Sequence, residues 1–361
     1  MGGVLAAAEA MAADLAVRLP RQRKTQRGQL ALLVATMLEA RSANVMDLAA
    51  SLPRAVDRLD MRYQWVARAL ANPLIDPDEV MAPYGREVLQ RLSESGQRIV
   101  LIIDQTQANA WLQLVMVAVR VGGRALPLAW RVKATQGAIG FPEQRAALAA
   151  VASWLPAAAR PVLMGDRFYG SPDLIAWCRG QGWDWRLRLK QDLLVFEAGG
   201  ETTLAASFAR GDHLLRDVQL TEKQVATNVA MVHEAGHPEP WIIALSETPS
   251  VHRAFDYGLR WGIEAMFSDF KSRGFGLADS NIRKADRLSR LVLVMALALF
   301  WAVSTGMWDA AQRLTPTEKK PRTGGPKTTP AASPRSSRAA SAASETASFA
   351  SSHSRHFGPY G

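Results

Sequence analysis

The spacing of hydrophobic side chains divides the chain near residue 98. Before that point they recur three and four positions apart in an Ala- and Leu-rich sequence with few strand signals, for example through residues 30–38 and 48–52. This spacing places them on one face of a helix, as is typical of amphipathic helices packed on a core. We therefore predict that residues 1–95 form a helical domain.

After residue 98 the pattern is typical of strands in a buried sheet. Residues 99–103 are an unbroken apolar run rich in β-branched side chains, as in a strand covered on both faces. Two further strand patterns flank Gly122-Gly123, so we predict a three-stranded meander. Helices and strands then alternate: a helix at 142–155, a strand at 161–164, a helix at 172–179 and a strand at 183–189. This order predicts an α/β fold with a mixed sheet and helices on its faces.

The rest of the chain divides into three segments. Residues 191–240 alternate apolar and polar positions among turn signals, which predicts a β-rich insertion between core parts at 96–190 and 241–315. After residue 315 the sequence is dominated by Ser, Ala, Pro, Thr and basic residues, so we predict a disordered low-complexity tail at 316–361. The elements predicted in the second core part are a strand at 241–245 and helices at 257–271 and 286–305.

The net charge favours a polyanionic partner. The chain carries 43 Lys and Arg residues against 33 Asp and Glu residues, a formal charge of +10. Nucleic acid is the commonest partner of so basic a protein, although a generally basic soluble surface gives the same balance. The single cysteine, Cys178, excludes a disulfide within the chain and suits a reducing compartment.

The sequence predicts neither a membrane span nor a secretion signal. The longest apolar run, at residues 291–303, has 13 residues, fewer than the ~20 that cross a bilayer as a helix. We interpret it as a buried core helix. The Ala-rich start of the chain contains Glu9 and Asp14 and has no basic segment before its apolar residues, unlike a signal peptide. We expect a cytoplasmic protein with no membrane partner.

Two basic clusters stand in the helical N-terminal region. The first has no acidic member, and the second interleaves basic side chains with aromatic rings, a combination that favours contact with DNA. Solvated helix faces produce similar runs, so both interpretations stay open at this point. The first basic cluster is Arg18, Arg21, Arg23, Lys24 and Arg27, and the second basic cluster is Arg54, Arg58, Arg62, Tyr63, Trp65 and Arg68.

Asp104 and Asp166 each follow a predicted buried strand. Sites in α/β proteins form at such strand ends, where side chains project from a rigid frame. A carboxylate beside an apolar run is unfavourable unless it binds something, and a divalent cation is its natural partner. Each aspartate could instead simply cap the turn that follows its strand. The pair is a candidate metal site.

A third group of polar side chains lies on the helix predicted at 257–271. Four of them fall within an arc of about 60° when residues are placed ~100° apart around the helix. They are Tyr257, Arg260, Glu264 and Lys271. A carboxylate that holds a metal, flanked by cations that hold phosphates, is what phosphodiester chemistry requires. Intrahelical ion pairing would explain only Arg260 and Glu264.

Together these motifs resemble one family of bacterial transposases. It is the Tyr-Arg-Glu-Lys signature family of insertion-sequence transposases, of the insertion-sequence-four type, within the DDE superfamily. The resemblance extends over roughly residues 25–305. The matching motifs are Tyr257-x2-Arg260-x3-Glu264-x6-Lys271, Asp104-Gln-Thr106 and Asp166-Arg-Phe-Tyr169.

The resemblance implies a ribonuclease-H-like core with a site of three carboxylates. It implies that Asp104, Asp166 and Glu264 bind two Mg²⁺ ions, for which Mn²⁺ can substitute. A tryptophan at the strand before the signature helix is implied to stack on a base flipped out beside the transposon end, although it could equally be a core residue. The implied DNA contacts come from Tyr257, Arg260, Lys271, Arg167 and this tryptophan, Trp241.

The implied reaction is cut-and-paste DNA transposition. The enzyme cleaves double-stranded DNA at the inverted repeats that end the transposon, and the freed 3′-hydroxyl attacks target DNA. The resemblance also implies a homodimer in the DNA complex and a location at the bacterial nucleoid, with residues 1–95 binding DNA. Two alternatives remain: a nuclease of the same fold that does not join strands, and a catalytically inactive derivative that only binds DNA.

One further motif is misleadingly similar to that of zinc proteases. His233-Glu-Ala-Gly-His237 has the H-E-x-x-H spacing, which requires both histidines on one face of a stable helix. Gly236 inside the motif and Pro238 after it oppose a helix, and the preceding residues alternate as in a strand. We therefore predict a β-turn here and no zinc site.

Overall fold

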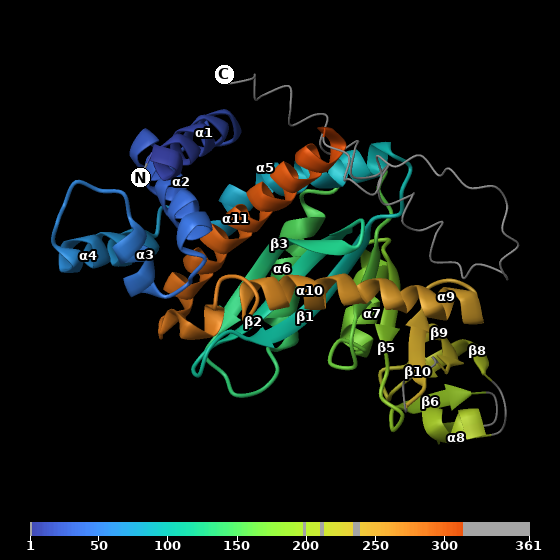
Figure 1. Ribbon diagram of the computed structural model, residues 1–361. Coiled ribbons are helices and arrows are strands. Elements are labelled where there is room, and N and C mark those ends of the chain that lie inside the picture. Colours follow the sequence, from blue (N-terminus) through green and yellow to red (C-terminus); the bar gives the residue numbers. More distant parts are fainter. Residues whose placement is uncertain (1, 198–199, 210–212, 234–238, 313–361) are drawn as a thin grey trace, which may run out of the picture.

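The computed structural model describes residues 2–197, 200–209, 213–233 and 239–312. Within these residues, helices come first, followed by a ten-stranded mixed sheet whose faces are covered by further helices (Figure 1). The turn predicted at 233–237 lies mostly outside the described residues, and the tail predicted at 316–361 lies wholly outside them.

The N-terminal region is helical, as its hydrophobic spacing predicts. Side chains cap two of the helices: Asn44 accepts a hydrogen bond from the Met46 N–H (2.8 Å), and Asp76 accepts one from the Glu79 N–H (3.0 Å). The helices are α1 (Gly2–Arg18), α2 (Lys24–Ala40), α3 (Val45–Ser51), α4 (Leu59–Leu70) and α5 (Pro77–Glu94).

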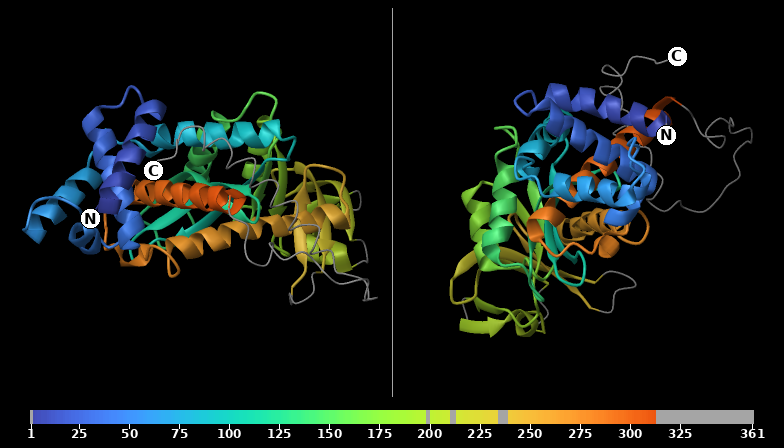
Figure 2. Two further views of the ribbon diagram at one scale, coloured as in Figure 1. Left: turned by 45° about the horizontal axis from the view of Figure 1, so that its top comes forward. Right: turned by 90° about the vertical axis from the view of Figure 1, so that its left-hand side faces the viewer.

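These helices share one hydrophobic core with the sheet. α2 packs against the last helix, α11 (Ala285–Gln312), as both views of Figure 2 show. The buried ring of Tyr84 on α5 meets the ring of Phe300 on α11 edge-on, with 5.1 Å between ring centres. The N-terminal helices are therefore held to the rest of the structure by buried apolar contacts.

The predicted meander forms one edge of the sheet. β1 (Val100–Gln107), β2 (Gln113–Val121) and β3 (Arg124–Lys133) pair antiparallel. On its other side β1 pairs parallel with β4 (Val162–Gly165), which pairs parallel with β5 (Asp184–Arg188). The order β3-β2-β1-β4-β5 is consistent with the ribonuclease-H-like core that the sequence predicts.

The β-rich insertion continues this sheet. β10 (Trp241–Leu245) pairs antiparallel with β5 on one side and with β9 (Val225–Val232) on the other. Beyond β9 the order is β8, β6 and β7, so the insertion strands extend the core sheet past β5. The other elements of the insertion are β6 (Leu194–Glu197), β7 (Gly200–Thr203), α8 (Leu204–Ala209) and β8 (Leu214–Leu220).

Helices cover both faces of the sheet (Figures 1 and 2). α6 (Phe141–Ala152) and α7 (Pro172–Gly180) lie on one face, and α10 (Gly262–Phe270) lies with α11 on the other. By length and hydropathy, Ala285–Ala310 of α11 could cross a membrane, but 67% of its most hydrophobic segment is buried in the structure. Its apolar surface packs on α2 and β3, which supports its interpretation as a core helix.

The helix predicted at 257–271 is divided in two. After α9 (Val251–Phe255), residues Asp256–Trp261 form a 3₁₀ helix, η1, and α-helical geometry begins only with α10. A 3₁₀ helix has three residues per turn, so Tyr257 and Arg260 still share one face. Lys271 follows the last residue of α10 instead of lying within the helix.

Candidate active site

Asp104 and Asp166 are neighbours on two adjacent parallel strands. β1 was predicted to end at residue 103 but continues to Gln107, so Asp104 lies within it, whereas Asp166 directly follows β4. Ile103 of β1 pairs with Gly165 of β4, and each aspartate is the next residue along its chain. Burial and then the negative charge of Asp166 raise the pKa of Asp104. The sequence placed both residues at strand ends, which is correct for Asp166 and wrong for Asp104, and the pairing of β1 with β4 brings the two positions together.

Backbone N–H groups orient both aspartates. The Gln105 N–H donates to Asp104 Oδ1 at 2.7 Å, and the Phe168 N–H donates to Asp166 Oδ1 at 2.9 Å. Capping a turn, the simpler interpretation of these residues, therefore applies to Asp166 and not to Asp104, which is followed by three further residues of β1. The bond to Gln105 leaves Oδ2 of Asp104 as the oxygen that meets another partner.

Arg260 joins Asp104 to Glu264. Its Nη1 donates to Asp104 Oδ2 at 2.9 Å, and its Nη2 donates to Glu264 Oε1 at 2.7 Å. Arg260 is 8% exposed, whereas the Glu264 side chain is 55% exposed. Arg260 thus links Asp104 with Glu264, and the pairing of β1 with β4 places Asp166 beside Asp104.

The carboxylates are only partly neutralised. Burial, together with the charges of Asp166 and Glu264, raises the pKa of Asp104 to about 6, although Arg260 opposes this shift. Burial alone would lower the pKa of Arg260, but Tyr257 and the carboxylates more than offset it, so the pKa is raised. Arg260 therefore stays charged, and its single positive charge faces three acidic groups.

The chemistry of these ligands suits a divalent cation. Carboxylates supply the hard oxygen ligands that Mg²⁺ and Mn²⁺ prefer, and a bound cation would relieve the repulsion that raises the pKa of Asp104. Among the described residues, no group of three His, Cys, Asp or Glu side chains is arranged as a metal site. Here the guanidinium of Arg260 lies between Asp104 and Glu264.

The other signature residues differ in their exposure. Tyr257 is 2% exposed, burial raises its pKa to about 12, and its ring centre lies 5.7 Å from the Arg260 guanidinium carbon. Lys271 is half-buried, which lowers its pKa, and it forms no ion pair within the described chain. Arg167 is exposed and donates to Glu239 at 2.6 Å. The ring of Tyr257 therefore lies against Arg260, Lys271 is open to a ligand, and Arg167 is exposed but paired with Glu239.

Two residues of this site had no role assigned from the sequence. Leu187 of β5 pairs with Gly165, so Arg188, the last residue of β5, lies beside Asp166 at the carboxyl ends of these two strands. Burial, and then the charge of Arg167, lower the pKa of Arg188. Tyr169 is buried, and burial followed by the charges of Asp104 and Asp166 raises the pKa of its hydroxyl group. The sequence signal that could have found Arg188 is a basic residue at the end of a predicted strand.

Trp241 lies in the core and not at the rim of the site, so the base stacking predicted for it is not available in this structure. The side chain is 1% exposed. Its ring meets those of Phe255, Tyr257 and Trp261 edge-on, at 6.3, 5.4 and 5.2 Å between centres. β10 is paired on both sides, which fixes the indole in this aromatic cluster. The alternative of a core tryptophan fits these contacts.

In the first basic cluster, Arg18 and Arg27 are engaged within the protein. Arg18 donates to Asp14 at 2.8 Å and to Glu87 at 2.5 Å, which ties α1 to α5. Arg27 donates to the carbonyl oxygens of Ala16 and Leu19, both at 3.2 Å. These two guanidinium groups therefore have structural partners that the sequence pattern did not reveal.

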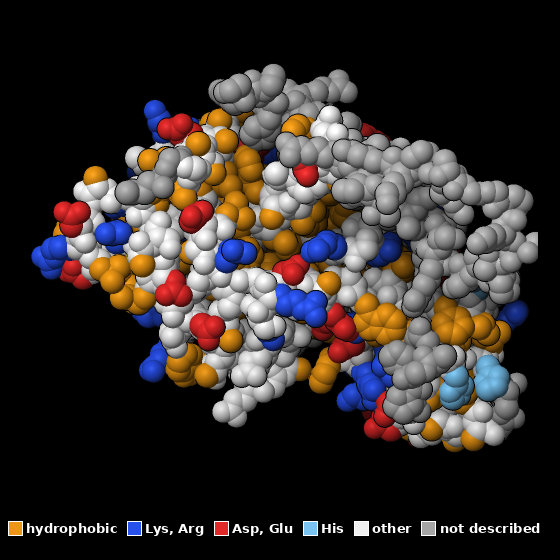
Figure 3. All heavy atoms as spheres, viewed as in Figure 1, with side chains coloured by type: hydrophobic (Ala, Val, Ile, Leu, Met, Phe, Trp, Pro, Cys, Tyr) orange, Lys and Arg blue, Asp and Glu red, His pale blue; other side chains and the backbone are white. Residues whose placement is uncertain are grey.

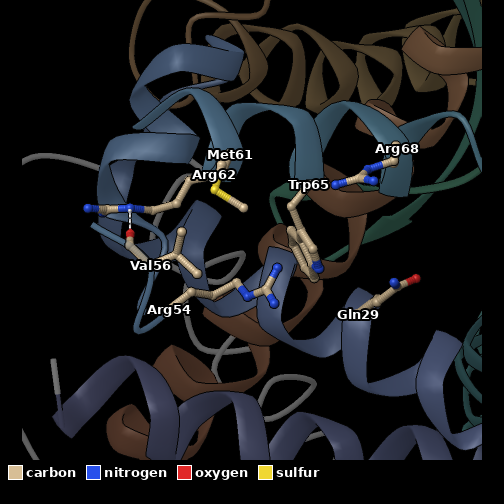
Figure 4. A pocket seen from close by; sticks show the side chains of 7 residues that line it. All are labelled: Gln29, Arg54, Val56, Met61, Arg62, Trp65 and Arg68. Atoms are coloured by element: carbon tan, nitrogen blue, oxygen red, sulfur yellow. Dashed lines mark hydrogen bonds between the residues drawn. The ribbon is translucent and has the colours of Figure 1, made fainter. Parts of the chain in front are cut away.

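Four residues of the second basic cluster line a cavity of about 440 Å³ beside α4, namely Arg54, Arg62, Trp65 and Arg68 (Figure 4). The guanidinium carbon of Arg54 lies 5.1 Å from the ring centre of Trp65. Arg62 donates to the Val56 carbonyl at 2.8 Å, and Arg68 donates within α4. Among the described residues, none of these three arginines has a carboxylate partner. The cavity therefore presents uncompensated positive charge beside an aromatic ring.

Comparison with known protein families supports a DDE transposase. Residues 142–301 match the family model described as a transposase DDE domain. The matched range contains Asp166 and Glu264, whereas Asp104 and the N-terminal helices precede it. No curated protein matches the chain. A transposase acts on DNA, so the match also implies DNA as a partner.

Replacing Gly165 by alanine tests the packing beneath the aspartates. The added Cβ would lie 2.7 Å from the Tyr169 Cβ and 3.1 Å from the Ile103 Cγ2, so the strand ends must shift. We expect Gly165→Ala to lower the free energy of unfolding by about 1–3 kcal/mol, measured by denaturant unfolding. Gly180→Ala is the control, because its Cβ meets nothing within 4 Å. Equal stability of Gly165→Ala and the unsubstituted protein would contradict this account.

Replacing Trp241 by alanine separates a core role from a role in base stacking. Loss of the buried indole should lower stability by about 3–5 kcal/mol and reduce nicking and second-strand cleavage in parallel. The half-exposed Trp111 provides a control, since Trp111→Ala removes an indole that is 40% exposed. Melting temperature and both cleavage rates are measured together. A Trp241→Ala protein of normal stability that loses only second-strand cleavage would restore the stacking role.

Proposed function

We propose that this protein is a cut-and-paste DNA transposase of the Tyr-Arg-Glu-Lys insertion-sequence family. Its catalytic carboxylates are Asp104, Asp166 and Glu264, which hold two Mg²⁺ ions or, in their place, Mn²⁺. The observation that carries the proposal is that Arg260 pairs with both Asp104 and Glu264 while β1 and β4 place Asp166 beside Asp104, although the three residues are 62 and 98 positions apart in the chain. The match to a transposase DDE domain supports it.

Each group in the site has a role in this proposal. Bound metal ions would polarise a phosphodiester oxygen and lower the pKa of the attacking water or hydroxyl group. β1 and β4 hold Asp104 and Asp166 on a rigid frame, which keeps their ligand oxygens in position. Lys271 and Arg167 contact phosphates of the DNA, with Arg260 and Tyr257 behind them.

The reaction consists of two displacements at phosphorus. Water first attacks a phosphodiester at the transposon end, and the bond to the 3′-oxygen breaks, which leaves a 3′-hydroxyl and a 5′-phosphate. The 3′-hydroxyl then attacks a phosphodiester of target DNA, and one P–O bond replaces another. The second step therefore needs no energy carrier. Because two transposon ends are handled together, we propose a homodimer in the DNA complex, at the nucleoid in the cytoplasm.

We place contacts with transposon-end DNA on α4. One side of this helix carries Arg62, Trp65 and Arg68 of the second basic cluster. The other side lines a cavity of about 380 Å³ together with Arg283, Lys284 and Arg287. Figure 3 shows Lys and Arg side chains spread over the molecule from the α4 region to α10, interrupted by acidic ones. A DNA backbone could follow this surface from the N-terminal helices toward the carboxylates.

Glu264→Gln tests the assigned activity. The substitution removes a metal-binding charge but no proposed phosphate contact, so DNA binding should persist. Mg²⁺-dependent nicking of DNA that carries the inverted repeats flanking the gene should fall about a thousandfold or more, equivalent to several kcal/mol. Asp173→Asn is the control, since Asp173 pairs with Lys223 on the surface. Undiminished nicking by Glu264→Gln would falsify the assignment.

Replacing Arg54 and Arg68 together by alanine tests the DNA surface. Both side chains contribute charge to the cavity without holding another element in place. Affinity for transposon-end DNA should fall, and the slope of log affinity against log salt should become shallower by up to about two, since each phosphate contact contributes ~0.9. The exposed Arg145 and Arg160 form the matched control pair. Equal slopes for the two double variants would place DNA recognition elsewhere.

A further inference from the structure

Arg260 and a metal ion would compete for the same oxygen of Asp104. Oδ1 of this aspartate already accepts the Gln105 N–H, so Oδ2 is the oxygen that faces the site. That oxygen accepts the Arg260 Nη1–H at 2.9 Å. An ion such as Mg²⁺ binds carboxylate oxygens at about 2.0–2.1 Å. A guanidinium therefore cannot keep its place between Asp104 and Glu264 when such an ion binds both.

The second pairing of Arg260 raises the same conflict at Glu264. Nη2 donates to Glu264 Oε1 at 2.7 Å, so one planar group spans two of the three proposed metal ligands. The Nε of Arg260 is buried and has no hydrogen-bond partner among the described residues. The guanidinium is therefore held by these two carboxylates and by the ring of Tyr257, and not by a full set of fixed partners.

Repulsion also favours exchange. Two carboxylates pair with one guanidinium, and Asp166 lies beside Asp104 on the next strand. The cation nearest to Asp166 along the sheet, Arg188, shares Glu239 with Arg167. A divalent ion would bring twice the charge of Arg260 to the same acidic groups. It would also repel a guanidinium that remained beside it, most strongly where water is excluded.

We propose that Arg260 is an exchangeable internal counter-ion, which pairs with Asp104 and Glu264 before metal binds and which a divalent cation displaces from both. The displaced guanidinium stays beside the site, and its N–H groups become available to a phosphodiester oxygen. Metal loading thereby prepares the contact with DNA. This inference rests on the proposed function, because it takes the carboxylates to be metal ligands.

The alternative is that Arg260 is a permanent positioning residue, and the two roles predict opposite changes in metal affinity. If Arg260 competes with the metal, its removal tightens metal binding. If it holds Asp104 and Glu264 in a binding-competent arrangement, its removal weakens metal binding. Metal affinity in the absence of DNA therefore distinguishes the roles without a measurement of catalysis.

The experiment is calorimetric titration of the full chain with Mn²⁺ alone. Arg260→Gln should bind Mn²⁺ about tenfold more tightly than the unsubstituted protein, which corresponds to loss of one competing charge-assisted hydrogen bond. Without metal, the melting temperature of Arg260→Gln should be lower than that of the unsubstituted protein. Mn²⁺ should raise it by more than it raises the melting temperature of the unsubstituted protein. Arg290→Gln is the matched control. The side chain of Arg290 is 11% exposed, against 10% for the side chain of Arg260, and it also pairs with a carboxylate four residues away, that of Asp286. Its Mn²⁺ affinity should not change.

Equal or weaker Mn²⁺ binding by Arg260→Gln would overturn the inference while leaving metal binding by the carboxylates intact. Absence of Mn²⁺ binding in the unsubstituted protein would overturn the proposed function together with it. If Arg260→Gln does not fold, Arg260→Lys serves in its place, since one ammonium group cannot span both carboxylates in the same geometry. It should show tighter Mn²⁺ binding than the unsubstituted protein, and weaker binding would again contradict exchange.

Discussion

Through its two ion pairs, Arg260 connects Asp104 with Glu264, which are far apart in the sequence. One reaches Asp104 within strand β1, and the other reaches Glu264 on α10. Without a cation at this position, acidic groups at the sheet edge and on α10 would face each other across a partly buried space, which is unfavourable. The proposed metal site, the support from Tyr257 and the proposed exchange all depend on this guanidinium.

The sheet supplies the rigid side of this arrangement. Parallel pairing of β1, β4 and β5 places Asp104, Asp166 and Arg188 side by side on neighbouring strands. The insertion strands lengthen the sheet on the side of β10, which buries Trp241 beneath η1 and so holds the segment that carries Tyr257 and Arg260. The aromatic cluster is thus a structural support of the site.

Local patterns predicted the elements well because strands and helices are set by the spacing of nearby side chains. The meander, the N-terminal helices and the strand-end position of Asp166 could be read in this way. The strand end predicted before Asp104 was wrong, because polar residues as far as Gln107 still pair with β2. Long-range pairing could not: nothing near Arg18 indicates Glu87, and nothing near Trp241 indicates the rings that enclose it. The 3₁₀ start of the signature helix was missed because its spacing also fits an α-helix.

Diffraction from crystals grown with Mn²⁺ tests the central claim most directly, because anomalous scattering locates the metal without reference to activity. The account predicts Mn²⁺ within coordination distance of Asp104, Asp166 and Glu264, about 2–2.3 Å from their oxygens. Arg260 should have moved away from Asp104 Oδ2. Mn²⁺ bound only elsewhere, or no anomalous peak at these carboxylates at saturating Mn²⁺, would contradict it.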